Sequence, residues 1–278
     1  MRLRCLVPPG RQGLQAVGAQ GKTEGGTVFA SISCVNAVSR RPRKDDESAP
    51  ADGAPRPKAV KPLGQESRCS AMLAVGLTGG VASGKTTVAQ VLKEEGAILL
   101  DADQIARELV EPHTPTWATL IKAFGTDILD EEGAIRRKKL AALVFADPHR
   151  RKRLNEILHP AIKKEIARRL EEIGLRNPEA IVVVDAALLV ETGDYREMDR
   201  LIVVTSTEAQ QVERLRQRDG ATREQALAIL ASQMGAEEKV KVADHVIRNE
   251  GSVEETRERA REVFQELRRM VRERKRGS

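Results

Sequence analysis

A glycine-rich loop lies between an apolar run that begins at residue 72 and a helical pattern that begins near residue 85. The loop reads Gly79-x-x-x-x-Gly84-Lys85-Thr86, which is the spacing of a phosphate-binding loop with the strand before it and the helix after it that such a loop requires. A strand followed by a loop and a helix is the repeating unit of α/β proteins with a parallel sheet. The sequence therefore predicts an α/β fold in which a parallel sheet carries a phosphate-binding loop.

Each residue type in this loop suits an anionic ligand. The glycines let the backbone approach a phosphate so closely that successive N–H groups point at it, and the helix N-terminus adds partial positive charge. The Lys85 ammonium can reach β- and γ-phosphate oxygens, and the Thr86 hydroxyl can bind Mg²⁺. We therefore predict a phosphate-loop NTPase fold, a three-layer sandwich, with a nucleotide site made of Gly79, Gly80, Val81, Ala82, Ser83, Gly84, Lys85, Thr86 and Thr87. A glycine-rich turn without a ligand is the alternative.

Two classes of NTPase lack their signatures in this chain. A GTPase would have an Asn-Lys-x-Asp motif for the base, and none is present. Transporter and helicase ATPases end a strand in paired Asp-Glu, whereas here the apolar run 181–185 ends in Asp185 and Ala186 follows. A carboxylate without a neighbouring general base can hold Mg²⁺ but has nothing to activate water. This favours phosphoryl transfer to an organic hydroxyl over hydrolysis, with Asp185 as a candidate metal ligand.

Another apolar run, 97–100, ends in Asp101-Ala-Asp103. Alternation at a strand end predicts both carboxylates on one side, at the carboxyl edge where parallel sheets bind ligands and one strand away from the phosphate loop. Phosphoryl transfer needs an acceptor held in line and a carboxylate that can take its proton. We expect at least one of the pair to act on the acceptor side. The alternative is that Asp103 only caps the helix that begins at Gln104.

Two helical stretches depart from the strand–helix alternation. Residues 116–175 have a helical apolar pattern, interrupted at His159-Pro160, and predict a lobe that binds the acceptor. Here His159 is either structural or a polar contact in the acceptor pocket. Residues 207–235 predict two helices that could close over the triphosphate as a lid, the second opened by a capping box of Thr222 and Gln225.

Two arginines of the predicted lid, Arg214 and Arg218, are four residues apart and so share a helix face. Their guanidinium groups could clamp the transferring phosphate oxygens. The alternative is a solvated basic face paired with Glu213 and Asp219. A last helix, Val253 to Arg274, has an apolar stripe that predicts core packing.

The composition separates residues 1–71 from residues 72–278. The chain has 47 basic and 41 acidic residues, of which 12 and 6 precede Met72. The rest of the chain therefore has 35 of each and a formal net charge of zero. The absence of a basic excess there argues against nucleic acid as a partner. All three cysteines also precede Met72, which excludes disulfides and thiol nucleophiles from the rest. We expect a folded domain at 72–278 behind an extension that is disordered or not translated, a transit peptide being the alternative. No apolar run approaches the ~20 residues of a membrane span, and we expect a cytoplasmic monomer or weak homo-oligomer.

Taken in order along the chain, these motifs resemble the dephospho-coenzyme A kinase family. The resemblance covers Met72 to about Met270 and none of the preceding residues. The matching motifs are the loop Leu77 to Thr86, the Asp-Ala-Asp-x-x-Ala-Arg segment from Asp101 to Arg107, His159-Pro160, Leu188-Leu189-x-Glu191, Gln217-Arg218-Asp219 and Asn249-x-Gly251.

This resemblance implies ATP- and Mg²⁺-dependent phosphorylation of the ribose 3′-hydroxyl of dephospho-CoA, the last step of coenzyme A biosynthesis. It makes Asp103 the catalytic base and puts Lys85, Arg214 and Arg218 on the phosphates. The other implied positions are the metal ligands Thr86, Asp101 and Asp185, the adenine contacts Asn249 and Gly251, and the acceptor contacts Asp101, Asp103, Arg107, His159, Leu188 and Glu191.

The chain departs from the family pattern at two positions on the acceptor side. Ala187 stands where the family usually has proline, and we expect it to loosen the turn there. His113 stands where the family commonly has glycine, and we expect a left-handed turn there to be remodelled. Two alternatives remain at this point: another phosphate-loop kinase acting on a nucleoside-like hydroxyl, and a nucleotide-binding switch that phosphorylates nothing.

Overall fold

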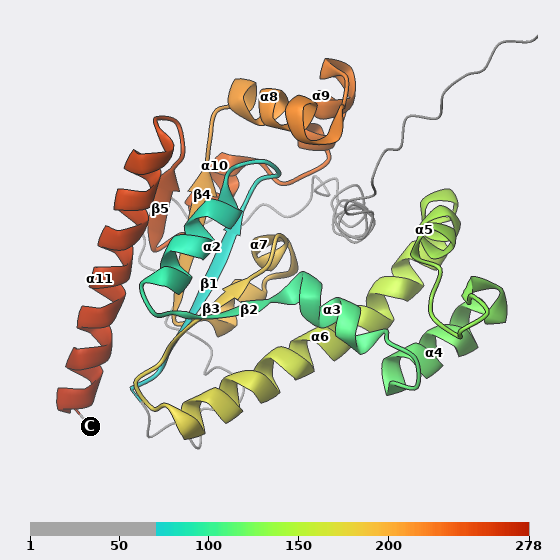
Figure 1. Ribbon diagram of the computed structural model, residues 1–278, viewed down its shortest axis with the longest axis horizontal. Helices are drawn as coiled ribbons and strands as arrows, with labels where there is room; N and C mark the ends of the chain where they lie inside the picture. The colour runs from blue at the N-terminus through green and yellow to red at the C-terminus, as the bar shows by residue number, and fades with distance from the viewer. Residues whose placement is uncertain (1–70, 278) are drawn as a thin grey trace, which may run out of the picture.

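The computed structural model describes residues 71–277, so the expectations for residues 1–70 lie outside the described residues. Five strands form one parallel sheet in the order β2-β3-β1-β4-β5 (Figure 1). Their bounds are β1 (Leu73–Gly79), β2 (Ile98–Asp101), β3 (Ile181–Asp185), β4 (Arg200–Thr205) and β5 (His245–Arg248). The predicted α/β fold with a parallel sheet is confirmed.

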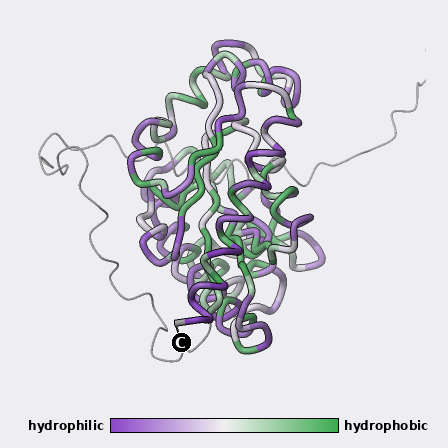
Figure 2. The backbone as a smooth tube through the Cα atoms, turned by 90° about the vertical axis from the view of Figure 1, so that its left-hand side faces the viewer, coloured by the Kyte–Doolittle hydropathy of each residue, from purple (hydrophilic) through white to green (hydrophobic). Residues whose placement is uncertain are grey.

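Helices cover both faces of this sheet and give the predicted three layers. One face packs against α2 (Lys85–Glu94) and α11 (Val253–Gly277), and the other against α3 (Ala102–Leu109) and the C-terminal half of α6 (Pro148–Arg176). The strand β1 is buried along its whole length, because helices cover both faces of the sheet. Its apolar sequence is typical of a strand in that position. Figure 2 shows the apolar colour concentrated along these central strands. Within residues 71–277, no helix has the length and apolar character needed to cross a membrane.

A helical lobe projects from the edge of the sheet that carries β2 (Figure 1). It consists of α4 (Pro115–Phe124), η2 (Thr126–Ile128), α5 (Arg137–Ala146) and the first half of α6. The lobe has an apolar core that includes Ala106 of α3. Ile162 of α6 packs against both this core and the core on the adjoining face of the sheet, so the lobe is joined to the sheet through α3 and α6.

The expected interruption at His159-Pro160 is wrong, because α6 runs unbroken for 29 residues with Pro160 inside it. A proline removes one N–H from the helix ladder and normally kinks or ends a helix. Here the residues before it, Leu154 and Leu158, pack in the lobe core, and Leu170 after it packs against the sheet. Tertiary packing on both sides keeps the helix continuous.

Two helices, α8 (Glu208–Asp219) and α9 (Arg223–Ala231), form the hairpin that we call the lid. They meet at Gly220, whose φ of 66° lies in the left-handed region. The predicted capping box of Thr222 and Gln225 is confirmed. The small core between the helices extends onto the phosphate-loop residues Val81 and Ala82, so the lid rests on that loop.

Three short helical elements lie in the connections that lead to β4 and β5. They are α7 (Leu189–Thr192) and η3 (Asp194–Glu197) between β3 and β4, and α10 (Ala236–Val240) between the lid and β5. Val240 and Leu189 share one small core with residues of β4. The chain that leaves the lid therefore packs beside the chain that leaves β3.

The turn at His113 is not remodelled. His113 adopts a φ of 70°, so a residue with a side chain occupies the left-handed conformation in which glycine is common. Its ring lies 5.5 Å from that of Trp117, measured between centroids. The contact with Trp117 helps to hold a backbone conformation that the residue type itself disfavours.

Candidate active site

The phosphate loop joins the end of β1 to the start of α2. Gly84 precedes α2 with a φ of 93°, and a Cβ there would collide with the side chain of Asn249. Glycine is therefore required twice at this position, for backbone conformation and for space. The first N–H groups of α2 have no partner within the helix, so they are available to a phosphate at this end.

Side chains of the lid region bind the outer side of this loop. The Val81 N–H donates to Gln233 Oε1 at 2.9 Å, and the Val81 carbonyl accepts from Gln211 Nε2 at 2.8 Å. In this structure the Val81 N–H is therefore used within the protein, and its predicted contact with a nucleotide stays a prediction. Neither glutamine was predicted as a site residue, because nothing in their local sequence distinguishes them from other helix-surface glutamines.

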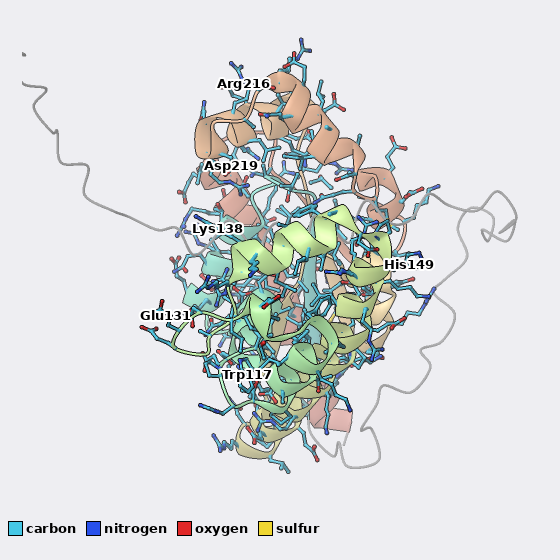
Figure 3. The ribbon with its side chains drawn as sticks, turned by 90° about the vertical axis from the view of Figure 1, so that its right-hand side faces the viewer. Trp117, Glu131, Lys138, His149, Arg216 and Asp219 are labelled. Atoms are coloured by element: carbon cyan, nitrogen blue, oxygen red, sulfur yellow. The ribbon has the colours of Figure 1, made fainter. Side chains whose placement is uncertain are left out.

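The two lid arginines have different surroundings despite their shared spacing. Arg214 donates to the Ala82 carbonyl at 3.1 Å and to the Asn249 carbonyl at 3.2 Å. Arg218 forms an ion pair with Asp219 at 2.7 Å, and its side chain is 60% exposed. Arg214 thus braces the phosphate loop, whereas Arg218 has the solvated pairing that we considered as the alternative. Figure 3 shows Arg216 at the outer end of the lid and Asp219 on the side of the lid that lies toward Lys138 of α5.

Lys85 forms an ion pair with Asp185, the last residue of β3. Burial is the main cause that raises the pKa of the Asp185 carboxyl; Lys85 opposes this, and the charges of Asp101 and Asp103 add to it. Asp101 lies directly opposite Asp185 in the strand register. The structure therefore brings the phosphate-loop lysine and the three candidate carboxylates to one edge of the sheet.

The expectation that strand alternation aligns Asp101 and Asp103 is wrong. The strand β2 ends at Asp101, and Asp103 lies in the first turn of α3. The capping alternative is wrong in its residue, because Asp101 is the cap: its carboxylate accepts from the N–H groups of Asp103 and Gln104 at 2.8 and 3.1 Å. The sheet order also places β3 between β2 and β1. Asp101 at the end of β2 is therefore two strands away from the phosphate loop, and the expectation of one strand is wrong.

This edge fits a magnesium ion held jointly with a nucleotide. Mg²⁺ is usually bound through one or two carboxylates together with phosphates and water. Asp101 and Asp185 offer such carboxylates, and Thr86 offers a hydroxyl in the first turn of α2. Within residues 71–277, no group of three His, Cys, Asp or Glu residues is arranged to hold a metal ion.

Asn249 is buried and its side chain is used within the protein. Its amide donates to the Ser83 carbonyl at 2.9 Å, and its carbonyl oxygen accepts from the Thr256 hydroxyl at 2.9 Å. In this structure the Asn249 side chain therefore holds the phosphate loop through the Ser83 carbonyl. Its predicted contact with adenine, and that of Gly251, stay predictions.

The predicted acceptor residues lie on three elements around the carboxylates. Arg107 lies in α3, His159 lies inside α6, and Leu188 and Glu191 follow β3. The Glu191 carboxylate pairs with Lys239 at 2.6 Å. We did not predict Lys239, because a lysine in a short charged segment normally indicates a solvated surface.

Arg137 in α5 is a further residue that the sequence analysis missed. Burial, together with the nearby charge of Arg107, lowers the pKa of its guanidinium group. The charges of Arg107 in α3 and Arg137 in α5 therefore act on each other, and the charge of Glu111 partly offsets this effect. Only the tertiary structure brings them together.

Comparison with known proteins identifies the family. A family model described as dephospho-CoA kinase matches residues 73–255. The chain belongs to the dephospho-CoA kinase family. The resemblance stated from the motifs is confirmed, and the chain is a kinase. The alternatives of a kinase with another acceptor and of a switch module are not favoured.

Individual dephospho-CoA kinases agree with this over most of their own length. The enzyme of Syntrophus aciditrophicus (strain SB) is 40% identical over 200 residues, which cover 72% of this chain and 85% of that protein. The enzyme of Carboxydothermus hydrogenoformans is 43% identical over 191 residues, covering 69% and 92%.

Two crystal structures are similar in fold. A Thermus thermophilus protein has a TM-score of 0.60 at 34% identity and covers 70% of this chain and 97% of its own. The dephospho-CoA kinase of Campylobacter jejuni has a TM-score of 0.52 at 28% identity and covers 71% and 98%. The fold of this chain is therefore similar to that of a solved dephospho-CoA kinase.

Proposed function

We propose that this kinase transfers the γ-phosphoryl group of ATP to the ribose 3′-hydroxyl of dephospho-CoA and releases CoA and ADP. The 3′-oxygen forms a new bond to the γ-phosphorus, and the bond from that phosphorus to the β,γ-bridging oxygen breaks. The hydroxyl proton passes to a carboxylate, for which Asp103 is our candidate. The observation that carries this proposal is the meeting of Lys85, Asp185, Asp101 and Asp103 at one edge of the sheet.

Lys85 and the first turn of α2 would bind the triphosphate, because an ammonium and free N–H groups favour anions there. Thr86, Asp101 and Asp185 would hold Mg²⁺, which neutralises phosphate charge when bound. Arg214 would act through the loop backbone that it binds, while Arg218 stays a candidate for direct phosphate contact when the lid closes. Arg107, His159, Leu188 and Glu191 remain our candidates for the acceptor. Monomeric or weakly oligomeric state, cytoplasmic location and independence of nucleic acid and membrane remain predictions.

The test is ADP release from ATP and Mg²⁺ by the full chain, with and without dephospho-CoA. We expect release to depend on dephospho-CoA and to be much weaker with adenosine, which lacks the pantetheine arm. A preference for adenosine would instead support a nucleoside kinase. ATP binding without acceptor-dependent release would support the switch module.

Lys85→Ala is the matched variant for this assay. We expect it to abolish transfer while the far-ultraviolet circular dichroism stays that of the parent chain. We also expect a lower Tm, because the largely buried Asp185 carboxylate loses its partner. Lys85 is partly exposed, so its loss opens no cavity in the core. Unchanged turnover in Lys85→Ala would refute the assignment of the phosphate loop.

A further inference from the structure

Lys239 is a buried lysine that the proposed transfer does not use. Its side chain is only 1% exposed, although it comes from the short helix α10 that follows the lid. Burying an ammonium group is costly unless it is paired and hydrogen-bonded. A chain that retains such a group at this position must hold it with specific partners.

Both partners of Lys239 lie in the loop that follows β3. Its Nζ is 2.6 Å from Glu191 Oε1 and donates to the Ala187 carbonyl at 3.4 Å. The Ala187 carbonyl also accepts from the Thr78 hydroxyl, at 3.0 Å, in the strand that leads into the phosphate loop. Lys239 thus fastens both ends of the segment 187–191.

This segment starts two residues after Asp185 and contains Leu188. At its start, the segment 187–191 follows Asp185, which pairs with Lys85. At its end, Glu191 pairs with Lys239 of α10. Since Leu188 and Glu191 are our candidates for the acceptor, any rotation of the segment would move the acceptor relative to the phosphate. Within residues 71–277, the ion pair and the side-chain hydrogen bond of the Lys239 ammonium are both with this segment.

We propose that Lys239 is a positioning residue for the acceptor, which fixes the Glu191 carboxylate and the Ala187 carbonyl and so sets the shape of the acceptor loop. This proposal rests on the proposed function. It also accounts for the turn at Ala187, which we expected to be loose without proline. Two donors, Thr78 and Lys239, hold the Ala187 carbonyl in place.

A purely structural ion pair is the competing explanation. Buried pairs can often be replaced by neutral residues of similar size without loss of stability, whereas removal of one partner leaves an uncompensated charge. A double replacement that removes both charges therefore separates the two explanations. A stability defect should disappear in it, and a positioning defect should remain.

The test compares four full-length proteins: the parent chain, Lys239→Met, the double variant Lys239→Met with Glu191→Gln, and Lys241→Met. Lys241 is an exposed lysine two residues further on, so its replacement controls for lost charge in this segment. For each we would measure Tm, kcat, and the KM values for dephospho-CoA and ATP well below the lowest Tm. We expect Lys239→Met to have the lowest Tm and the double variant to recover most of it.

The decisive result is the KM of the double variant. We expect its KM for dephospho-CoA to stay raised by about tenfold or more, as for the loss of a buried ionic contact that positions the acceptor loop, with the KM for ATP within about twofold of the parent. A parental KM for dephospho-CoA in the double variant, or equal rises in both KM values, would overturn the proposal. Because Glu191 is itself a candidate acceptor contact, Glu191→Gln alone is measured as well. A KM for dephospho-CoA that is no higher in the double variant than in Glu191→Gln would also overturn the proposal. If Lys239→Met does not fold, the double variant and Glu191→Gln carry the comparison. If the parent chain releases no ADP in response to dephospho-CoA, the proposed function is overturned instead.

Discussion

Three carboxylates and one ammonium group meet where β2 and β3 end. Asp185 is largely buried beside Lys85, and the charges of Asp101 and Asp103 lie close enough to raise its pKa further. One lysine does not balance three carboxylates at neutral pH. A divalent cation at this edge would lie between these carboxylates and the phosphates and reduce the repulsion between them, an arrangement that suits Mg²⁺.

We predict that Asp103→Asn lowers kcat by about 10²–10⁴-fold, the range of a lost general base, while ATP affinity changes little. The amide has nearly the size of the carboxylate but cannot take the hydroxyl proton. The measurement is kcat at saturating dephospho-CoA together with ATP titration of the same protein. Asp127→Asn, at an exposed position of the lobe, is the matched control. Equal losses of turnover and ATP affinity would show that Asp103 has a structural role.

The strained backbone at His113 allows a comparison of two variants. His113→Gly and His113→Ala both lose the ring contact with Trp117, but only glycine relieves the φ of 70°. We expect His113→Gly to be more stable than His113→Ala by about 1 kcal/mol in urea unfolding. The glycine variant being equal or less stable would mean that the turn relaxes when the imidazole is removed.

At the scale of elements, the lid and the phosphate loop form one assembly. Capping boxes open both lid helices and define where each begins. Side chains from α8 and from the turn after α9 then bind Val81 and Ala82, and Ala82 itself has a left-handed φ of 56°. Because alanine disfavours that conformation, contacts from the lid help to keep the loop in its binding shape.

Gln233→Met should therefore weaken ATP binding. The Val81 N–H loses its acceptor, and we expect the Kd for ATP to rise by about fivefold to tenfold, the equivalent of one hydrogen bond, with the KM for dephospho-CoA unchanged. The measurement is calorimetric titration with ATP. Gln90→Met is the matched control, because Gln90 is exposed on α2 and bonds only to Glu94. An unchanged Kd in Gln233→Met would mean that the loop keeps its shape without the lid.

At the scale of the whole molecule, residues 71–277 contain three layers with an apolar core on each face of the sheet. Ala71, at the boundary that we drew from composition, is already buried in one of these cores. The family match begins two residues later, at residue 73. All the candidate site residues lie within this part of the chain.

We predict that a protein comprising residues 71–278 has the Tm of the full chain within about 2–4 °C, the shift expected from a change of about 1 kcal/mol. Its kcat and KM for dephospho-CoA should lie within about twofold of the full-length values. Thermal unfolding and the ADP-release assay measure both. A fragment that folds but has lost activity would assign a functional role to residues 1–70.

Local signals in the sequence were enough to predict the phosphate loop, the parallel α/β fold, the lid hairpin with its capping box, and the family. They suffice because backbone conformation, hydrophobic period and helix caps act over a few neighbouring residues. The ordered motifs also named the carboxylates Asp101, Asp103 and Asp185, which the structure places near one edge of the sheet; their roles stay predictions.

Only the tertiary structure decided the rest. It placed β3 between β1 and β2, kept α6 continuous through Pro160, made Asp101 the helix cap, and brought Gln233 and Lys239 to the loops that they hold. Gln233 is 152 residues from Val81 along the chain. Such contacts depend on how the packed elements are arranged in space, and a pattern confined to neighbouring residues carries no information about that arrangement.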